Sequence, residues 1–354
     1  MNILVRAPNW VGDAMMAIPA LESIRRARPG SEISVLARPA VAELFSGESF
    51  ADRILVYDFR GRHRGWAGRE RLAQELRREK FDVAILLQNA FAAAWLAWRV
   101  GIPERIGYAR DARGPLLTRA VRVPQDGEIP KHESHFYLEL LRRAGWIEAA
   151  AAIPMIRLHV SGAAREAAES ALRRAGAREN AWRCAIAPGA SYGAAKCWPA
   201  ERFALLADRL ISESGADVIF FGTPAEQEIA ARIRAGMKSR AISFVGETSM
   251  RDLAALLASC SAFIGNDSGA MHVAAAVGLP VIGIFGSTDP EGTAPVTEHF
   301  TLIREKASCS PCFLRRCPVD HRCMARIAVN SVFAAAAQVQ RLPRDLSIRG
   351  TGNV

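Results

Sequence analysis

The chain of 354 residues has no long hydrophobic run and no targeting segment. The apolar stretch 86–100 comes nearest to a membrane span, but Gln88, Asn89 and Arg99 interrupt it. Strand-like residues begin at Ile3, so the N-terminus lacks the pattern of a signal peptide. We therefore expect a cytoplasmic protein that touches a membrane only peripherally, and we expect its seven cysteines to be reduced.

A concentrated basic stripe of the kind that binds nucleic acid is also missing. The chain carries 46 Lys and Arg against 36 Asp and Glu, a formal net charge of +10. Many of the arginines alternate with acidic residues on helix-like faces, as in 69–71 and 77–80, and solvated faces explain much of the excess. The rest indicates an anionic partner, either a phosphorylated substrate or an acidic membrane surface, and no nucleic acid is expected.

A Gly-x-Gly-x-x-Gly dinucleotide fingerprint is absent as well. Strand and helix signals nevertheless alternate in two series, which is typical of α/β proteins with doubly wound parallel sheets. The first series predicts strands at 3–5, 32–36, 53–56 and 82–87 and helices at 14–28, 40–45 and 69–80. The second series predicts strands at 184–187, 217–221, 242–245, 262–264 and 281–285 and helices at 200–214, 225–237 and 250–259.

This alternation predicts two facing doubly wound domains with a cleft between them. We expect an N-terminal domain at 1–160, a C-terminal domain at 161–342 and a tail at 343–354. The stretch 154–182, which holds a helix at 162–175, is interpreted as the connection between the domains. Ligands of such sheets bind at the carboxyl ends of the strands, so the loops at those ends are the candidate sites.

The polar turn Asn-Asp-Ser-Gly-Ala-Met-His at 266–272 lies between two apolar strand-like segments. Asp267 and Ser268 stand where helix N-caps are found. The start of a helix carries unpaired N–H groups and a partial positive charge, which favour a bound phosphate or diphosphate. The alternative is simple capping of a βαβ unit, and other loops must decide between the two.

Three further loops carry candidate residues. Asp13 follows the first strand and could act as a general base or merely cap the next helix. Lys196 stands in a small-residue loop at 188–199, where it would meet a phosphate or remain a solvated lysine. Glu226 follows another buried strand, where it would bind ribose hydroxyls or simply favour the first turn of a helix.

Four cysteines gather within 15 residues, with His321 among them: Cys309, Cys312, Cys317 and Cys323. A tetrahedral structural zinc is one interpretation, although the spacing departs from the paired Cys-x-x-Cys pattern. Reduced thiols that pack a compact loop and an iron–sulfur site are the alternatives. No open set of carboxylates and histidines accompanies the cluster, so no catalytic metal is expected.

In their order along the chain, these segments resemble glycosyltransferase family 9, the lipopolysaccharide heptosyltransferases, and especially their heptosyltransferase II subgroup. The most specific pair is Trp-Val-Gly-Asp at 10–13 and Asn-Asp-Ser-Gly-x-Met-His at 266–272. The likeness extends over nearly the whole chain, and part of the family has a similar cysteine cluster. The other matching stretches are 3–13 with Met15 and Met16, 86–91, 101–108, 188–199 and 221–226.

The resemblance implies a GT-B fold in which the C-terminal domain mainly binds the donor and the N-terminal domain the acceptor. It implies inverting transfer of L-glycero-D-manno-heptose from ADP-heptose to the heptose of a lipid A–Kdo–heptose acceptor, with no cofactor required. Position by position, it implies Asp13 as the general base. The donor residues that it implies are Ser191, Lys196, Glu226, Met250, Asp267, Ser268, Gly269 and His272.

On the acceptor side the resemblance points to Asn89, in a loop that departs from the Leu-Pro-Asn-Ser form of the family. Arg60 and Arg64, with Arg62 between them, would meet an anionic acceptor, or they form a solvated basic loop. We expect a monomer at the inner face of the inner membrane. The alternatives are a heptosyltransferase of type I or III, another GT-B nucleotide-sugar enzyme such as a 2-epimerase, and a non-enzymatic ADP-binding or nucleotide-sugar-binding module.

Overall fold

Two parallel β-sheets organise the chain, one in each of two units. The computed structural model describes residues 1–148 and 153–342, and it divides into a first unit, Met1–Pro154, and a second unit that begins at Met155. Each unit contains a six-stranded sheet with helices packed on it, so the predicted doubly wound α/β class is confirmed. The proposed tail 343–354 lies outside the described residues.

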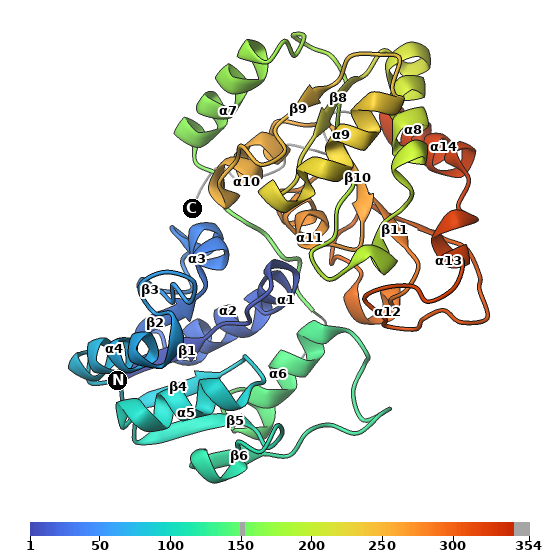
Figure 1. The fold of residues 1–354 in the computed structure, drawn as a ribbon. Helices are drawn as coiled ribbons and strands as arrows, with labels where there is room; N and C mark the ends of the chain where they lie inside the picture. The colour runs from blue at the N-terminus through green and yellow to red at the C-terminus, as the bar shows by residue number, and fades with distance from the viewer. Residues whose placement is uncertain (149–152, 343–354) are drawn as a thin grey trace. The chain divides into compact units, whose positions relative to one another are not determined.

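The first unit begins directly with a buried strand and alternates strands with helices (Figure 1). Its strands are β1 (Asn2–Arg6), β2 (Glu32–Ala37), β3 (Arg53–Val56), β4 (Val83–Leu86), β5 (Glu104–Tyr108) and β6 (Arg119–Val121). Its helices are α1 (Val11–Met16), α2 (Ile18–Ala27), α3 (Pro39–Phe45), α4 (Gly65–Arg78), α5 (Phe91–Val100) and α6 (Glu133–Arg143), with a 3-10 turn η1 (Gly114–Leu116).

The second unit repeats this alternation. Its strands are β7 (Arg183–Ala187), β8 (Asp217–Phe220), β9 (Ile242–Ser243), β10 (Ala262–Asn266), β11 (Val281–Phe285) and β12 (Phe300–Arg304). Its helices are α7 (Gly162–Arg174), α8 (Ala200–Ser214), α9 (Gln227–Gly236), α10 (Met250–Ala258), α11 (Gly269–Ala276), α12 (Pro290–Thr293), α13 (Arg322–Ala325) and α14 (Val329–Gln340), with 3-10 turns η2 (Ala194–Lys196) and η3 (Pro224–Glu226).

The two sheets have the same strand order. The first runs β3-β2-β1-β4-β5-β6 and the second β12-β11-β10-β7-β8-β9, so in each unit the first strand pairs in parallel with the second and the fourth. Successive strands are added toward one edge of the sheet up to the third strand and toward the other edge from the fourth. This switch in strand order occurs at the parallel pairs β1–β4 and β7–β10. The carboxyl ends of the strands at such a topological switch point are where doubly wound sheets bind ligands. The fold therefore singles out the loops after β1, β4, β7 and β10.

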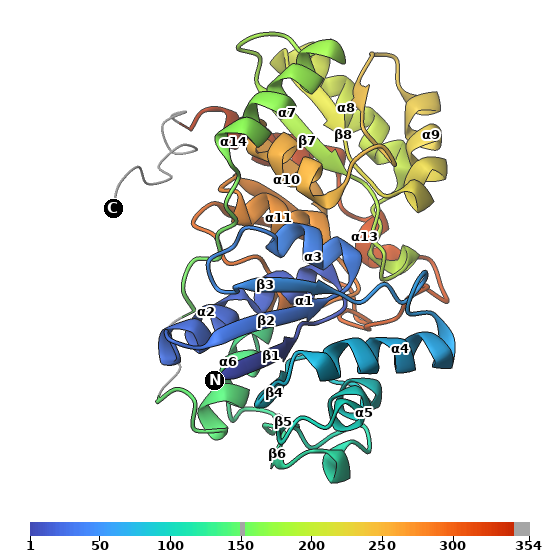
Figure 2. The same cartoon turned by 90° about the vertical axis from the view of Figure 1, so that its left-hand side faces the viewer.

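Burial explains why these segments become strands and helices. The central strands are covered on both faces and consist of nearly continuous apolar residues, as in β10 and β11, where every residue is buried. The helices bury one face each: α4 lies against α5 and α2 against α6, while α8 packs with both α9 and α14 (Figures 1 and 2). Helix α7 packs against α10, so it belongs to the second unit rather than to a free connection.

The predicted helix at 14–28 is wrong in its bounds. The structure has two helices there, and Ala17 separates α1 from α2. Pro19 stands in the first turn of α2, where its missing N–H is harmless, but in one continuous helix it would remove a hydrogen bond. Because α1 begins at Val11, Asp13 lies inside its first turn and the N-cap position belongs to Trp10. The alternative that Asp13 caps the helix is therefore wrong.

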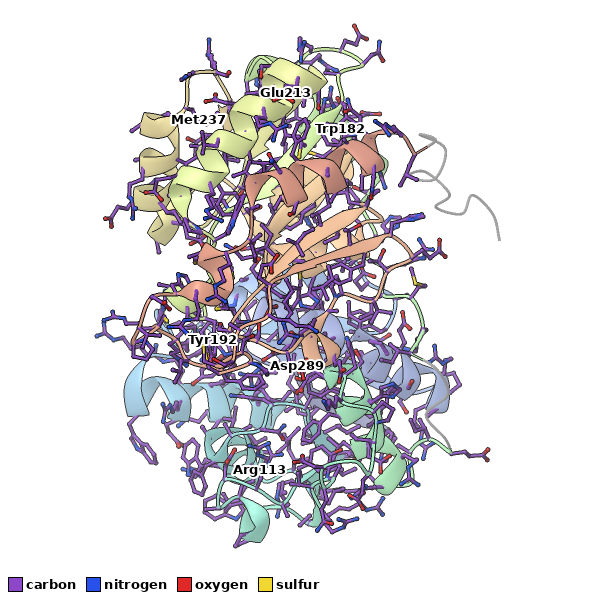
Figure 3. All side chains as sticks on the ribbon, turned by 90° about the vertical axis from the view of Figure 1, so that its right-hand side faces the viewer. Arg113, Trp182, Tyr192, Glu213, Met237 and Asp289 are labelled. Atoms are coloured by element: carbon purple, nitrogen blue, oxygen red, sulfur yellow. The ribbon has the colours of Figure 1, made fainter. Side chains whose placement is uncertain are left out.

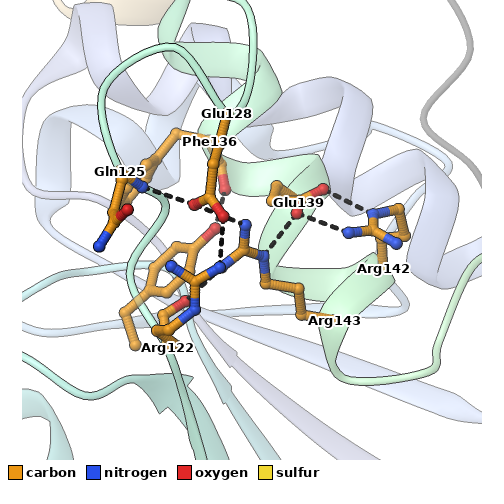
Figure 4. Close-up of polar contacts among 8 residues, drawn as sticks. Arg122, Gln125, Glu128, Phe136, Glu139, Arg142 and Arg143 are labelled. Carbon is orange, nitrogen blue, oxygen red and sulfur yellow. Dashed lines mark hydrogen bonds and ion pairs between the residues drawn. The ribbon is translucent and has the colours of Figure 1, made fainter.

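Ion pairs fix α6 to the segment before it (Figure 4). The Glu139 carboxylate, which is buried, accepts hydrogen bonds from Arg142 and Arg143, and Arg143 also pairs with Glu128. Glu128 in turn pairs with Arg122 and accepts the backbone N–H of Gln125. These donors lower the pKa of Glu128 to about 2, the bonds from Arg122, Gln125 and Arg143 being the main causes.

None of the helices in ranges 1–148 and 153–342 is both long and apolar enough to cross a membrane.

Candidate functional site

The loop after β7 is tied to the end of β10 by one buried amide. Asn266, the last residue of β10, donates from Nδ2 to the Pro188 carbonyl at 2.7 Å and accepts the Trp198 N–H at 2.9 Å. Trp198 is itself fully buried and donates from its indole to the Ile327 carbonyl. The loop at 188–199 is thus held at both ends against the switch point of the second sheet.

Within this frame, Lys196 and Asp267 form an ion pair with an Nζ–Oδ2 distance of 2.5 Å. Their side chains are 12% and 5% exposed, so the pair is largely removed from water and its attraction is weakly screened. The same Asp267 oxygen accepts the Thr288 hydroxyl at 2.6 Å, and Thr293 lies at 3.5 Å. The alternative of a solvated lysine is wrong, because Lys196 is locked beside the turn at 266–272.

Helix α11 starts immediately after this pair. Ser268 is its N-cap, as predicted, yet its hydroxyl makes no capping bond and is buried without a hydrogen-bond partner in the described part of the chain. The Asp267 carboxylate accepts hydrogen bonds from Lys196 and Thr288 and does not cap helix α11. Gly269 is the first residue of α11, and the His272 side chain is buried one turn further on. The first N–H groups of any helix have no partner within the helix, so at the start of α11 such donors lie beside the unused Ser268 hydroxyl.

Glu226 lies beside the same loop. Its Oε2 accepts the backbone N–H of Thr223 at 2.7 Å and the Thr223 hydroxyl at 3.0 Å, so the alternative of a helix-start carboxylate holds for this oxygen. The other oxygen reaches the backbone of the loop after β7, because a Cβ built on Gly189 would overlap it. In the residues that the structure describes, this Oε1 has no hydrogen-bond donor. One carboxylate oxygen thus remains for a ligand.

The cysteine segment braces this site. The Ala195 N–H donates to the Arg315 carbonyl at 3.1 Å, and His321 Nε2 lies 2.9 Å from the Ala195 carbonyl. The hydroxyl of Tyr192, a residue labelled in Figure 3, donates to the Phe313 carbonyl at 2.7 Å. The Lys196 ammonium also lies 5.0 Å from the centre of the Tyr192 ring, within reach of a cation–π contact. The loop 309–323 therefore supports the segment that carries Lys196.

The thiols of this loop are free. Cys309 is exposed, Cys312 and Cys317 are half-buried and Cys323 is buried. Among residues 1–148 and 153–342, no group of three or more His, Cys, Asp or Glu is arranged to hold a metal ion. This finding gives the zinc interpretation no support, and reduced thiols in a compact loop stay a prediction.

The remaining two donor candidates are Ser191 and Met250. Ser191 is exposed in the turn before η2, and Met250 is the first residue of α10, whose N-cap Ser249 forms a capping box with Asp252. The structure thus brings Lys196, Asp267 and Ser268 to one strand edge, with Glu226 beside the adjoining loop. It leaves the roles of Ser191 and Met250 as expectations.

The candidate base stands at the switch point of the first sheet. Asp13 lies in α1, directly after the loop that follows β1, and α1 packs against α6. Glu133 is the first residue of α6 and interacts with the Asp13 carboxylate. Burial raises the pKa of Glu133, and the negative charge of Asp13 raises it further. Tyr137, fully buried, hydrogen-bonds Glu133, and burial raises its pKa as well. Two carboxyl groups thus interact in a partly dry environment, which is typical of proton-transfer sites.

Asn89, in the loop after β4, is held in place by a buried arginine. Its Oδ1 accepts from Arg113 Nη2 at 2.7 Å, while Nη1 of that arginine donates to the Gln88 carbonyl at 2.5 Å. Arg113, which is labelled in Figure 3, is fully buried, and burial lowers its pKa to about 10. Sequence inspection missed this arginine, since nothing near it in the sequence marks a buried brace. It fixes the loop that carries Asn89.

The arginines of the segment before α4 differ from one another. Arg60 lies 5.4 Å from the centre of the Phe59 ring, and Arg64 is the exposed N-cap of α4. Arg62 is bound to Glu75 at 2.5 Å. Arg62 is therefore neutralised by Glu75. Arg60 and Arg64 pair with no acid among the described residues, so they are the candidates for contact with an anionic partner.

Comparison with known proteins agrees with this geometry. Residues 69–322 match the model of glycosyltransferase family 9 (heptosyltransferase). The chain is 31% identical to lipopolysaccharide heptosyltransferase 2 of Salmonella typhimurium, over 86% of this chain and 88% of that protein. The structure of ADP-heptose LPS heptosyltransferase II of Escherichia coli is similar with a TM-score of 0.79 at 26% identity, covering 96% of this chain and 98% of that one.

A family 9 glycosyltransferase of Veillonella parvula has the same fold, with a TM-score of 0.81 at 24% identity and 96% of each chain covered. The family model alone spans well over half of the chain. Together with the strand order and the paired switch points, these matches identify the chain as a member of glycosyltransferase family 9, the heptosyltransferases, and hence as a glycosyltransferase.

Proposed function

We propose that this enzyme is a heptosyltransferase II, which transfers L-glycero-D-manno-heptose from ADP-heptose to the heptose of a lipid A–Kdo–heptose acceptor with inversion. The observation that carries the donor assignment is the Lys196–Asp267 pair beside the unused Ser268 hydroxyl and the start of α11. A cation, a free hydroxyl and unpaired N–H groups at a switch point suit a diphosphate.

The second unit would bind the donor. Lys196 and the N–H groups at the start of α11 contact the diphosphate, and they stabilise the negative charge that grows on ADP as it departs. Because these groups supply positive potential themselves, the transfer proceeds without a metal ion. The free Oε1 of Glu226 accepts hydrogen bonds from the ribose hydroxyls, as acidic residues do in other nucleotide sites. Ser191, Met250, Gly269 and His272 complete the proposed donor site.

The first unit would supply the base. An acceptor hydroxyl attacks the anomeric carbon of the donor, a C–O bond forms, and the bond from that carbon to the diphosphate breaks with its electron pair leaving on ADP. Asp13 Oδ takes the proton of the attacking hydroxyl. One in-line displacement inverts the anomeric configuration, so no covalent nucleophile is needed. Asn89, Arg60 and Arg64 are the proposed acceptor contacts.

A transfer assay tests the whole proposal. The purified chain is given ADP-heptose or UDP-glucose together with an acceptor that carries one inner-core heptose, in buffer with EDTA, and the product is identified by mass spectrometry and NMR. We expect one added heptose of inverted configuration from ADP-heptose and none from UDP-glucose. ADP binding without any turnover would instead support the non-enzymatic module, and activity lost with EDTA would contradict metal-independent transfer.

We also propose that the first unit touches the inner face of the inner membrane. Phe91, Trp95 and Trp98 stand at helical spacing along one side of α5, and Trp66 of α4 lies 4.9 Å from Trp95 between ring centres. Trp66, Trp98 and Phe91 are 67%, 50% and 48% exposed. Exposed tryptophans suit the interface between headgroups and acyl chains, where one end of the ring is apolar and the other is wet.

Co-sedimentation with vesicles tests this surface. Wild type is expected to bind vesicles that contain anionic lipid, and the double variant Trp66→Ala, Trp98→Ala to bind them several-fold more weakly. The control is Leu205→Ala, which removes another exposed apolar side chain from the second unit. Equal binding by the double variant and the control would contradict the proposed surface.

A further inference from the structure

The first unit holds a cavity of about 150 Å³ whose arginines have no part in the roles proposed so far. Its wall includes Arg6 at the end of β1, Arg38 after β2, Tyr57 after β3 and Gln88 after β4. It therefore opens at the carboxyl edge of the sheet, where doubly wound sheets bind ligands. Asn9, from the loop after β1, also lines it.

The inner wall carries a buried cation. Arg6 is 2% exposed, and within the described part of the chain its guanidinium donates to neutral groups alone: the Ala7 and Leu36 carbonyls and the Asn9 amide oxygen. It also lies 5.5 Å from the centre of the Tyr57 ring. Burial, and after it the charge of Arg38, lower the pKa of Arg6 to about 9. A buried guanidinium with no opposing charge is costly, and an entering anion would offset that cost.

A second guanidinium of the wall is also unpaired. Arg38 stacks 3.9 Å from the centre of the Phe59 ring, and its Nε is buried with no hydrogen-bond partner in the described part of the chain. Across residues 1–148 and 153–342 this side chain makes no ion pair. Arg69, exposed on α4, adds a third cation at the lining. Three cations therefore converge on one small space.

The acids nearby do not neutralise these cations. None of the residues that line the cavity is an Asp or Glu among those the structure describes. The Asp58 carboxylate accepts the Gly61 and Arg62 N–H groups, and Glu75 pairs with Arg62. Each of these two carboxylates thus already has partners of its own.

The histidine of the wall has a defined tautomer. The Nδ1 atom of His63 accepts the Asp58 N–H at 3.1 Å, so the ring proton is on Nε2, which lies 3.2 Å from Glu75. In this state His63 adds no positive charge, and the charge of the cavity comes from its arginines.

We propose that this cavity binds a phosphoryl group, held by the guanidinium groups of Arg6 and Arg38. Two cations at the wall match a dianion better than a carboxylate, which has one charge, and guanidinium forks suit phosphate oxygens. The phosphoryl group belongs either to a phosphorylated acceptor saccharide or to free phosphate. The first assignment rests on the proposed function.

Calorimetric titration of the full chain with inorganic phosphate, at saturating ADP and constant ionic strength, tests the site. Arg38→Gln is expected to weaken phosphate binding at least about tenfold, since it removes a charge-assisted hydrogen-bond donor. The matched control, Arg62→Gln, removes an arginine of the same segment that Glu75 already neutralises, and it should stay within about twofold of wild type. Phosphate binding by Arg38→Gln equal to that of wild type overturns the proposal.

Two further measurements distinguish an acceptor phosphate from free phosphate, and a failure of the cavity proposal from a failure of the proposed donor site. If the acceptor supplies the group, enzymatic removal of its phosphates raises the wild-type KM about tenfold and leaves the already raised KM of Arg38→Gln unchanged. An unchanged wild-type KM, with phosphate binding still lost in Arg38→Gln, assigns the cavity to free phosphate. ADP affinity is measured by titration of the same protein preparations before ADP is added. If ADP does not bind, the proposed donor site is contradicted, whereas the difference in phosphate binding between Arg38→Gln and Arg62→Gln reports on the cavity alone.

Discussion

The two switch points of this protein share one backbone plan and differ in charge. At the second, between β7 and β10, the Lys196 cation is closed into a pair with Asp267, and Thr288 binds the same carboxylate. At the first, between β1 and β4, the Arg6 cation is buried against carbonyls and an amide, and no carboxylate of residues 1–148 and 153–342 is bound to it. The sheet order is therefore not what distinguishes the two sites.

The difference shows how one fold hosts two binding chemistries. A lysine held by an aspartate is positioned in advance, and its field toward a ligand is reduced by the partner, so backbone N–H groups and hydroxyls must contribute to binding a diphosphate. An unpaired buried arginine keeps its full charge and is costly until an anion arrives. Function resides in these side chains and not in the shared topology.

The largest expected effect is that of Asp13→Asn, a substitution that changes the first switch point and leaves the second as it is. If Asp13 is the base, the rate of heptose transfer falls by on the order of 10²–10⁴-fold, because the amide cannot take the proton. ADP affinity, which depends on the second unit, should not change. The control is Asp111→Asn, an exposed aspartate in a weak ion pair with Arg110. A transfer rate near that of the control would contradict the assignment.

The next effect belongs to the second switch point. Lys196→Gln removes the cation and leaves the buried Asp267 carboxylate without its ion-pair partner. We expect ADP affinity to fall roughly tenfold to a hundredfold, since a charge-assisted contact is lost, together with a lower midpoint of thermal unfolding. Calorimetry with ADP measures the first and a melting curve the second. The double variant Lys196→Gln, Asp267→Asn should recover part of the stability but not the affinity.

Much of the fold could be predicted because apolar runs and breaks in them are local signals. The predicted helix at 200–214 matches α8, and the strands at 53–56 and 281–285 match β3 and β11. Strands β5 and β6 gave weaker signals: β5 begins with two charged residues and contains a glycine, and β6 has three residues. The apolar periodicity runs on through the break between α1 and α2, and Pro19 is the residue that indicates it.

The site could be predicted as separate loops but not as contacts. Lys196 and Asp267 are 71 residues apart, and nothing in either loop says that they pair. Thr288 was missed, although a Ser-Thr-Asp run after a buried strand is the same kind of signal as the loops that were chosen. Arg113 and Arg6 were missed because a buried guanidinium among carbonyls depends on tertiary packing.

A smaller effect sharpens the comparison at the donor side. In Gly189→Ala the new methyl group would overlap the Glu226 carboxylate and displace it from the loop after β7. Overpacking of this kind costs about 1–3 kcal/mol. If Glu226 holds the ribose and about 1 kcal/mol of that cost is lost from binding, ADP affinity should fall by roughly fivefold to tenfold. Gly162→Ala is the control, since open space surrounds that glycine at the start of α7. ADP affinity that is unchanged in Gly189→Ala would contradict the ribose contact.

The smallest effect concerns the ion pairs that support α6, away from either switch point. Glu128 has a pKa of about 2 in the folded state, below the usual value of 4.5, so its contribution to stability is complete above about pH 5 and is lost as the pH falls toward 2. Glu128→Gln should therefore be slightly less stable than wild type at pH 7, and the two unfolding curves should converge near pH 2. The control Glu148→Gln removes an exposed carboxylate with no ion pair in the described chain, so its stability should follow that of wild type at every pH.

Because the ion pairs of Glu128 are partly exposed, 0.5 M salt should narrow the difference in stability between wild type and Glu128→Gln at pH 7. Urea unfolding at several pH values measures each point, and a gap that widens as the pH falls would show that Glu128 is not stabilised by its arginines.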